Sequence, residues 1–164
     1  LGINVIERPV DYGSDDAPTI LALQHAIGGL EDTFDAVITL QPTSPFRQSK
    51  HINAALKLFT NEPCDSLVSV QKIPHNFCFE KTMNINNERV ILDDNLKRSQ
   101  DTSVRYARNG AGIYISNISL IMQGRILGDN ILPFEMNKIE SLDIDDLEDW
   151  VIAEALMNFL ELNN

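Results

Sequence analysis

Two aspartates near the C-terminal end, Asp143 and Asp145, have a spacing that suits metal chemistry. In an extended segment, residues i and i+2 point to the same face, so both carboxylates would project together. Such a pair suits Mg²⁺, which usually keeps several waters and takes substrate phosphates as further ligands. On these residues alone, the simpler alternative is that Asp145 or Asp146 caps the following helix. The two roles are compatible, with Asp145 on a metal and Asp146 as the cap.

A stiff polar loop, QPTSPFR at residues 41–47, follows the apolar run from Ala36 to Leu40. Its two prolines prevent the loop from continuing as a strand or joining a helix. In open α/β sheets, ligands bind where a buried strand ends in such a loop. We therefore expect this loop to lie at a ligand site.

A third polar segment, RNGAG at residues 108–112, precedes an expected strand. Glycine lets backbone N–H groups approach a ligand closely, and Asn109 could read a carboxylate, an N-acyl group or a hydroxyl. Arg98, Arg105 and Arg108 lie within eleven residues of one another, and arginine suits bidentate recognition of carboxylate or phosphate. Taken singly, a turn and solvated salt bridges explain these residues more simply.

Composition limits the possible partners of the chain. Its 164 residues suit one domain, and its net charge of −11 argues against binding to nucleic acid or to an anionic membrane surface. An anionic ligand would need a cation or locally placed arginines and lysines. Cys64 and Cys78 lack a CxxC pattern, which favours free thiols in a reducing, cytoplasmic compartment over a zinc site. No run has transmembrane length, and no signal peptide is visible.

The elements that must position these groups alternate between strand and helix. We expect strands at residues 3–6, 36–40 and 66–70, with helices at about 18–30 and 49–60 between them. Asp15 or Asp16 is expected to cap the first helix, with Pro18 in its first turn. This alternation predicts one α/β domain over residues 1–164, with parallel strands joined by right-handed crossovers.

Residues 71–104 break this alternation. Part of this region resembles a hairpin that turns at Asn86 and Asn87, and the rest is a polar loop, so we expect an insertion outside the main sheet. Strands at 112–116 and 132–136 and a short helix at 119–123 follow. A short strand then leads into a C-terminal helix, for which we expect Leu147, Trp150 and Val151, with Ala155, on the inward face.

Four segments, in this order, resemble the acylneuraminate cytidylyltransferase family, which comprises the CMP-sialic acid synthetases and their bacterial relatives acting on legionaminic and pseudaminic acids. The segments are ERP and SDDAPT (within 7–19), LQPTSPFR (40–47), YARNGAGIYI (106–115) and SLDIDDLEDWVIAE (141–154). The combination of QPTSPFR with a downstream DID and DW is the specific part of the resemblance, which spans nearly the whole chain.

The resemblance implies a Rossmann-like, GT-A-like nucleotidyltransferase fold with three layers and a mainly parallel sheet. It implies a homodimer that exchanges the inserted segment between subunits. The implied reaction is Mg²⁺-dependent transfer of CMP from CTP to a nonulosonic acid, with release of pyrophosphate. By position, Asp143 and Asp145 would bind the metal, and Arg8, Ala17 and Thr19 would contact the cytidine nucleotide.

The remaining implied roles concern the sugar acid. Gln41 and Asn109 would recognise it, with Arg108 and Tyr114 as further substrate-binding candidates. Arg98 and Lys81 would reach from the inserted segment into the site of the neighbouring subunit.

Three features of the sequence depart from the family pattern. The family's N-terminal ARxGSKxxxxKN-type loop, which holds the triphosphate, is absent from the sequence, so we expect a fragment truncated at the N-terminus. Ser99 stands where relatives often carry a second arginine, and NGAGIYI is one residue longer than the usual NGAIYI, which affects the alignment of Tyr114. The alternatives are a non-catalytic remnant that binds the sugar acid or the nucleotide, and a different sugar nucleotidyltransferase.

Overall fold

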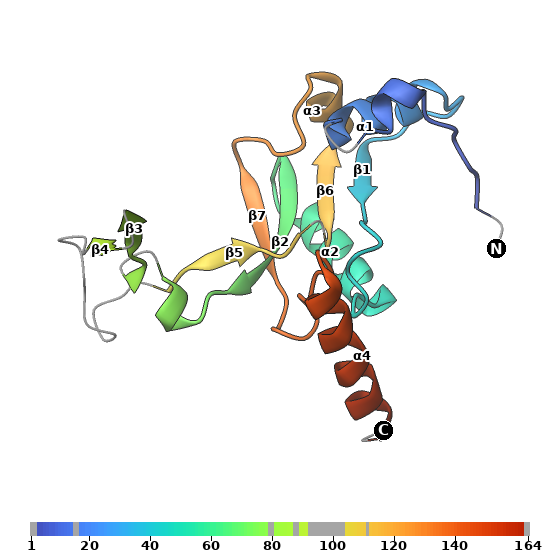
Figure 1. The fold of residues 1–164 in the computed structure, drawn as a ribbon. Coiled ribbons are helices and arrows are strands. Elements are labelled where there is room, and N and C mark those ends of the chain that lie inside the picture. The colour runs from blue at the N-terminus through green and yellow to red at the C-terminus, as the bar shows by residue number, and fades with distance from the viewer. Residues whose placement is uncertain are drawn as a thin grey trace.

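The computed structural model describes residues 3–14, 17–78, 81–86, 89–91, 104–110 and 112–162. Five strands form the main sheet (Figure 1). They are β1 (Ala36–Thr39), β2 (Ser66–Lys72), β5 (Tyr106–Arg108), β6 (Tyr114–Asn117) and β7 (Ile131–Glu135). The order is β1-β6-β2-β5, and β7 lies on the opposite side of β2 from β6. The α/β class is confirmed.

The expectation of a mainly parallel sheet is wrong for the described residues. Of the four strand pairings in this sheet, only β2 with β7 is parallel, and the other three are antiparallel. β1 and β2 do run in the same direction, because both are antiparallel to β6. The strand–helix–strand pattern thus predicted the directions of β1 and β2 correctly. It could not show that β6, from much later in the chain, lies between them.

Four α-helices accompany the sheet in the described part of the chain. They are α1 (Thr19–Gly28), α2 (Ser49–Asn61), α3 (Ile118–Met122) and α4 (Leu147–Leu162), and two short 3-10 turns lie at Val10–Tyr12 and His75–Phe77. α1 and α3 pack together at one end of the sheet, where Gln24 donates a hydrogen bond of 2.7 Å to the carbonyl of Ile121 (Figure 1). Pro18 occupies the N-cap of α1 without a side-chain cap, and the expected caps at residues 15 and 16 lie outside the described residues.

Apolar side chains from α2, β2, β6 and the segments beside them form the core. Ala55, Leu67, Ile113, Ile115 and Met136 are its fully or almost fully buried members. The apolar stripe of α2 explains its packing, because it places Ala55 and Ile52 toward β2. This core fixes α2 and β2 relative to each other, and the site described below depends on that placement.

The expected strand at residues 3–6 does not form. Ile3 and Val5 are exposed and belong to no strand of the described structure. A strand needs a neighbour for its backbone groups, and no described strand pairs with this segment.

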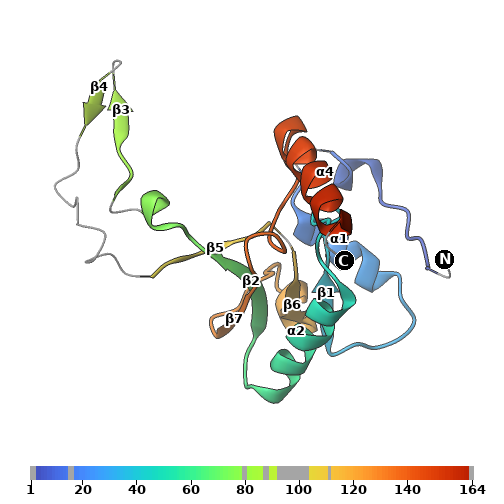
Figure 2. The same ribbon diagram turned by 90° about the horizontal axis from the view of Figure 1, so that it is seen from below.

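The expected hairpin in the inserted region is confirmed. β3 (Asn84–Asn86) and β4 (Arg89–Ile91) form a separate antiparallel pair, which stands away from the main sheet (Figures 1 and 2). Asn86, expected in the turn, instead belongs to β3 and pairs with Arg89, and Asn87 lies outside the described residues. The insertion also begins later than residue 71, because β2 continues to Lys72 and pairs with β5.

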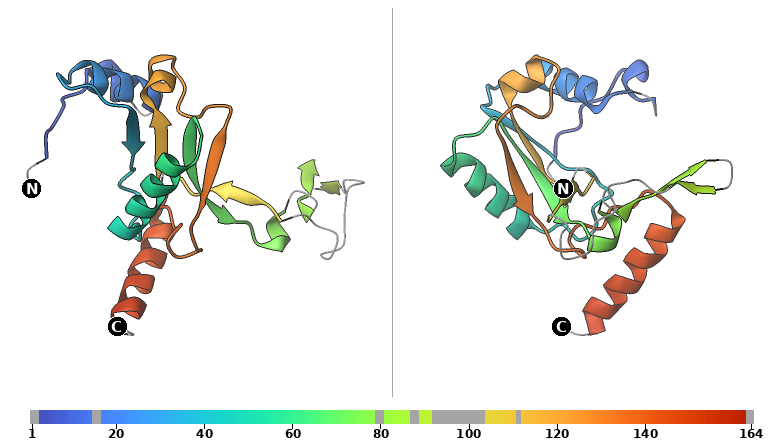
Figure 3. Two further views of the ribbon diagram at one scale, coloured as in Figure 1. Left: turned by 180° about the vertical axis from the view of Figure 1, so that it is seen from behind. Right: turned by 90° about the vertical axis from the view of Figure 1, so that its left-hand side faces the viewer.

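The C-terminal helix differs from its predicted orientation. Leu147, Trp150 and Val151 are 77%, 52% and 57% exposed, Ala155 is also exposed, and Ala153 is the buried residue of α4. Most of α4 extends away from the sheet (Figures 1 and 3). Apolar residues surround this helix on several sides, so periodicity could not identify the side that packs. In the described residues, no helix is both long enough and apolar enough to cross a membrane.

Candidate active site

A polar cleft of about 350 Å³ lies beyond the ends of β2 and β7, where strands that run in the same direction end. Ligand sites of α/β sheets occupy such positions. Three segments line the cleft: the end of β2, the loop after β5, and the chain between β7 and the first turn of α4. The lining residues are Gln71, Arg108, Asn109, Gly110, Lys138, Ser141, Leu142, Asp143, Asp145 and Asp149.

The RNGAG segment forms a large bulge between β5 and β6. Arg108 pairs with Val70 and Tyr114 pairs with Val68, so the described residues 109, 110, 112 and 113 lie opposite Ser69 alone. The hydroxyl of Ser69 accepts a hydrogen bond of 2.8 Å from the backbone N–H of Ile113 and so supports the bulge. Bulges beside active sites commonly redirect side chains, and this one turns the segment toward the cleft.

Asn109 lies beneath the cleft and is 3% exposed. Its Oδ1 accepts a 2.6 Å hydrogen bond from the Ser69 hydroxyl, and its Nδ2 donates to Ser141 Oγ at 3.0 Å and to Met136 Sδ at 3.5 Å. The amide is therefore engaged within the protein. Recognition of the sugar acid by Asn109 stays a prediction, and these contacts give the residue a second role in holding the bulge against Ser141.

Gly110 shapes the position of Asp143. It has a φ of +61°, and a Cβ at this position would overlap Oδ2 of Asp143. The other oxygen, Oδ1, is buried and has no hydrogen-bond partner in the described structure. The carboxylate of Asp143 thus lies against a backbone that only glycine leaves open, with one oxygen unsatisfied.

The DID segment is irregular rather than the short strand that we expected. The N–H of Ile144 donates to the carbonyl of Thr43 at 2.9 Å, which fixes the segment to the QPTSP loop. Asp143 and Asp145 nevertheless line the same cleft, as their spacing predicted. Asp146 caps α4, because its Oδ1 accepts a 2.9 Å hydrogen bond from the N–H of Asp149.

The donor set of the cleft fits Mg²⁺. Among the described residues, no group of three or more His, Cys, Asp or Glu side chains could hold a metal. Mg²⁺ does not require such a group, since it is usually bound by one or two carboxylates with waters and substrate phosphates. The unpartnered Oδ1 of Asp143 would gain a partner from a cation. Asp143 and Asp145 are thus the residues that could hold the metal.

Arg47 connects the QPTSP loop to the bulge. One guanidinium nitrogen donates to the carbonyl of Gln41 at 2.8 Å and to the carbonyl of Gly112 at 2.9 Å. Desolvation by burial lowers the pKa of Arg47 from its usual value. The sequence predicted no role for Arg47, whereas in the structure it connects the loop to the bulge.

Of the predicted site residues, the cleft brings together Arg108, Asn109, Asp143 and Asp145. Gln41 and Tyr114 lie on adjoining elements without lining the cleft, and Arg8, Ala17 and Thr19 lie in the N-terminal segment and the start of α1. Lys81 follows the second 3-10 turn, and Arg98 lies outside the described residues. Their predicted roles stay predictions.

Lys138 is the lining residue whose role sequence reasoning missed. It lies in the turn after β7 and gives the cleft a second cation besides Arg108. No motif marked it, because a single lysine in a turn has no sequence signal. Two cations beside the three carboxylates of Asp143, Asp145 and Asp149 suit a ligand that is itself anionic and arrives with a metal.

A larger hollow of about 410 Å³ lies between α4 and the QPTSP loop. Pro45, Ile144, Trp150, Ala153 and Met157 make most of its wall apolar, with Glu154 and Asn158 completing it. The smaller cleft is the better candidate site, because it contains the carboxylates and cations.

The α/β sheet places three carboxylates and two cations around one cleft beyond its strand ends, a set of groups that could hold an anionic ligand together with a cation. No family model matches the chain. The N-acylneuraminate cytidylyltransferase of Escherichia coli O18:K1:H7 is 32% identical over 155 residues, covering 93% of this chain and 36% of that protein. The CMP-N,N'-diacetyllegionaminic acid synthase of Legionella pneumophila is 32% identical over 154 residues, covering 92% and 64%.

A vertebrate relative shows the same similarity. The N-acylneuraminate cytidylyltransferase A of Danio rerio is 35% identical over 124 residues, which cover 73% of this chain and 28% of that protein. The chain is thus related to the acylneuraminate cytidylyltransferases, and its resemblance to them is confirmed. It spans between 28% and 64% of the length of these three relatives.

Proposed function

We propose that this chain supplies the metal-binding and sugar-acid-binding part of a cytidylyltransferase. The enzyme would join CMP from CTP to a nonulosonic acid of the sialic type and release pyrophosphate. The observation that carries the proposal is that Asp143 and Asp145 line one cleft and that Oδ1 of Asp143 is buried without a partner among the described residues. The chain is also related to enzymes of that name.

Asp143 and Asp145 would hold Mg²⁺ in this proposal. The metal, when bound, would polarise the α-phosphate and orient the attacking hydroxyl. Arg108 and Lys138 would offset the charge of the phosphates and of the sugar carboxylate, which the acidic chain would otherwise repel. Gly110 leaves room for the Asp143 carboxylate beside the cleft. In this proposal, orientation of the two substrates in the cleft would supply most of the acceleration.

Finer features of the family belong to the same proposal. We infer a GT-A-like, three-layer architecture for the whole protein and a homodimer that exchanges the segment around β3 and β4. The position of this hairpin away from the main sheet supports the exchange. Cys64 and Cys78 are free thiols, which supports a cytoplasmic location.

The test is an assay of the protein as its gene encodes it, with any flanking residues. Incubation with CTP, Mg²⁺ and a panel of nonulosonic acids should release pyrophosphate with one or a few of them. ATP, GTP and UTP in place of CTP serve as controls for the base. Pyrophosphate release with another nucleotide and none with CTP would assign the chain to a different sugar nucleotidyltransferase. Absence of release with every pair would leave a binding protein without transferase activity.

A further inference from the structure

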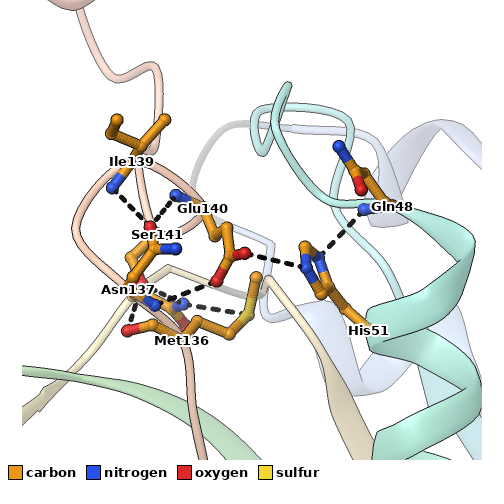
Figure 4. A network of polar contacts seen from close by, with 8 residues as sticks. Gln48, His51, Met136, Asn137, Ile139, Glu140 and Ser141 are labelled. Carbon is orange, nitrogen blue, oxygen red and sulfur yellow. Dashed lines mark hydrogen bonds and ion pairs between the residues drawn. The ribbon is translucent and has the colours of Figure 1, made fainter.

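His51 lies in the first turn of α2 and is almost fully buried, with 7% of its surface exposed. Its Nδ1 accepts a 3.1 Å hydrogen bond from the backbone N–H of Gln48, which forms part of the capping box of this helix. This acceptor role places the ring proton on Nε2. Nε2 then donates to Oε1 of Glu140 at 3.1 Å (Figure 4). The two ring nitrogens thus have different partners on different elements.

Glu140 belongs to a tight turn at residues 137–141, between β7 and the DID segment. Its second oxygen accepts a 3.1 Å hydrogen bond from the N–H of Asn137. Oδ1 of Asn137 accepts from the N–H groups of Ile139 and Glu140, each at 3.0 Å, and the carbonyl of Asn137 accepts from the N–H of Ser141 (Figure 4). The turn is therefore internally bonded, and Glu140 connects it to α2.

The turn leads directly to Asp143. Ser141 lies two residues before it and accepts the hydrogen bond from Asn109, while Ile144 lies one residue after it and donates to Thr43. The chain around Asp143 is thus held on one side by the turn that His51 anchors and on the other by the QPTSP loop. Because α2 starts directly after that loop, one segment of the chain supplies both anchors.

We propose that His51 is a positioning residue for the metal site: through Glu140 it fixes the turn that sets the place of the Asp143 carboxylate. This inference rests on the proposed function, in which Asp143 and Asp145 hold Mg²⁺. Mg²⁺ demands near-ideal octahedral geometry, so a small displacement of one carboxylate weakens its binding. Groups that orient metal ligands typically contribute 10- to 100-fold to metal affinity.

Two substitutions each remove the hydrogen bond of one ring nitrogen of His51 and keep the bond of the other. In His51→Asn, the amide oxygen replaces Nδ1 and keeps the bond from Gln48, but the shorter side chain loses Glu140. In His51→Gln, the amide N–H₂ reaches the place of Nε2 and keeps Glu140, while the bond from Gln48 is lost. A residue that only stabilises α2 would make His51→Gln the more damaging change.

The experiment measures Mn²⁺ binding to the protein as encoded, by the loss of the free Mn²⁺ signal in electron paramagnetic resonance. Mn²⁺ is the probe because it shares the preference of Mg²⁺ for carboxylate and water ligands. We expect binding about tenfold weaker in His51→Asn and near wild type in His51→Gln, with the lower melting temperature in His51→Gln. His25→Asn, on α1 and outside the lining of the cleft, serves as the control and should bind as wild type.

Asp143→Asn is measured beside these variants, because it shows whether a negative result contradicts the metal assignment or only the positioning role of His51. If it binds Mn²⁺ as well as wild type, the metal assignment of the proposed function is wrong, and the inference falls with it. If Asp143→Asn loses Mn²⁺ and His51→Asn does not, only the positioning role is wrong. Loss of binding in both His51 variants, in proportion to their melting temperatures, would also overturn the inference by showing a purely structural role.

Discussion

Replacing Gly110 with alanine should displace the carboxylate of Asp143. Gly110 has a φ of +61°, a left-handed conformation that costs a residue with a Cβ about 1–2 kcal/mol. At roughly 2–4 °C per kcal/mol for a chain of this size, the melting temperature should fall by roughly 2–8 °C. The new Cβ would also overlap Oδ2 of Asp143, so the carboxylate must rotate away. We expect binding of Mn²⁺, used as the probe for Mg²⁺, to be lost or strongly weakened.

Gly124 provides a matched control for this prediction. Its φ is +80°, and a Cβ there would meet no atom within 4 Å. Gly124→Ala should therefore lower the melting temperature by a similar amount without affecting metal binding. Thermal unfolding and the Mn²⁺ titration, measured on both variants, separate the backbone cost from the displacement of Asp143. Equal Mn²⁺ affinity in the two variants would refute the argument that Gly110 shapes the site.

Two further substitutions test the supports of the cleft. Asn109→Ala should lower the free energy of unfolding by about 1–3 kcal/mol in urea denaturation, because the buried hydroxyls of Ser69 and Ser141 each lose one hydrogen bond. An unchanged stability with weaker sugar-acid binding would instead make Asn109 a recognition residue. Arg47→Met should lower stability by a similar 1–3 kcal/mol, since the carbonyls of Gln41 and Gly112 lose their shared donor. Full stability of this variant would show that the bridge does not hold the loop to the bulge.

Periodicity and turn chemistry predicted most of the elements in the described chain. The apolar spacing identified α2, the β-type runs identified β2 and β7, and the asparagines identified the hairpin of β3 and β4. These signals are local, so they could not show that β6 lies between β1 and β2. Nor could they orient α4, whose apolar residues point in several directions.

Local sequence signals also predicted part of the candidate site, but not the contacts between distant residues that support it. The i, i+2 spacing of Asp143 and Asp145 predicted one shared cleft, even though the segment is not a strand. The contacts that support the cleft join distant residues: Arg47 reaches Gly112, 65 positions away, and His51 reaches Glu140, 89 positions away. A single sequence does not contain such pairings, so only the fold revealed these two residues as supports.

The most direct test of the central claim is Mg²⁺-dependent pyrophosphate release from CTP and the preferred nonulosonic acid. It compares wild-type protein with Asp143→Asn and Asp145→Asn. Asp146→Asn is the control, because Asp146 caps α4 outside the cleft and asparagine is an equally good cap. We predict that release is lost in the first two variants and kept in the control. Full turnover by Asp143→Asn or Asp145→Asn would contradict the account.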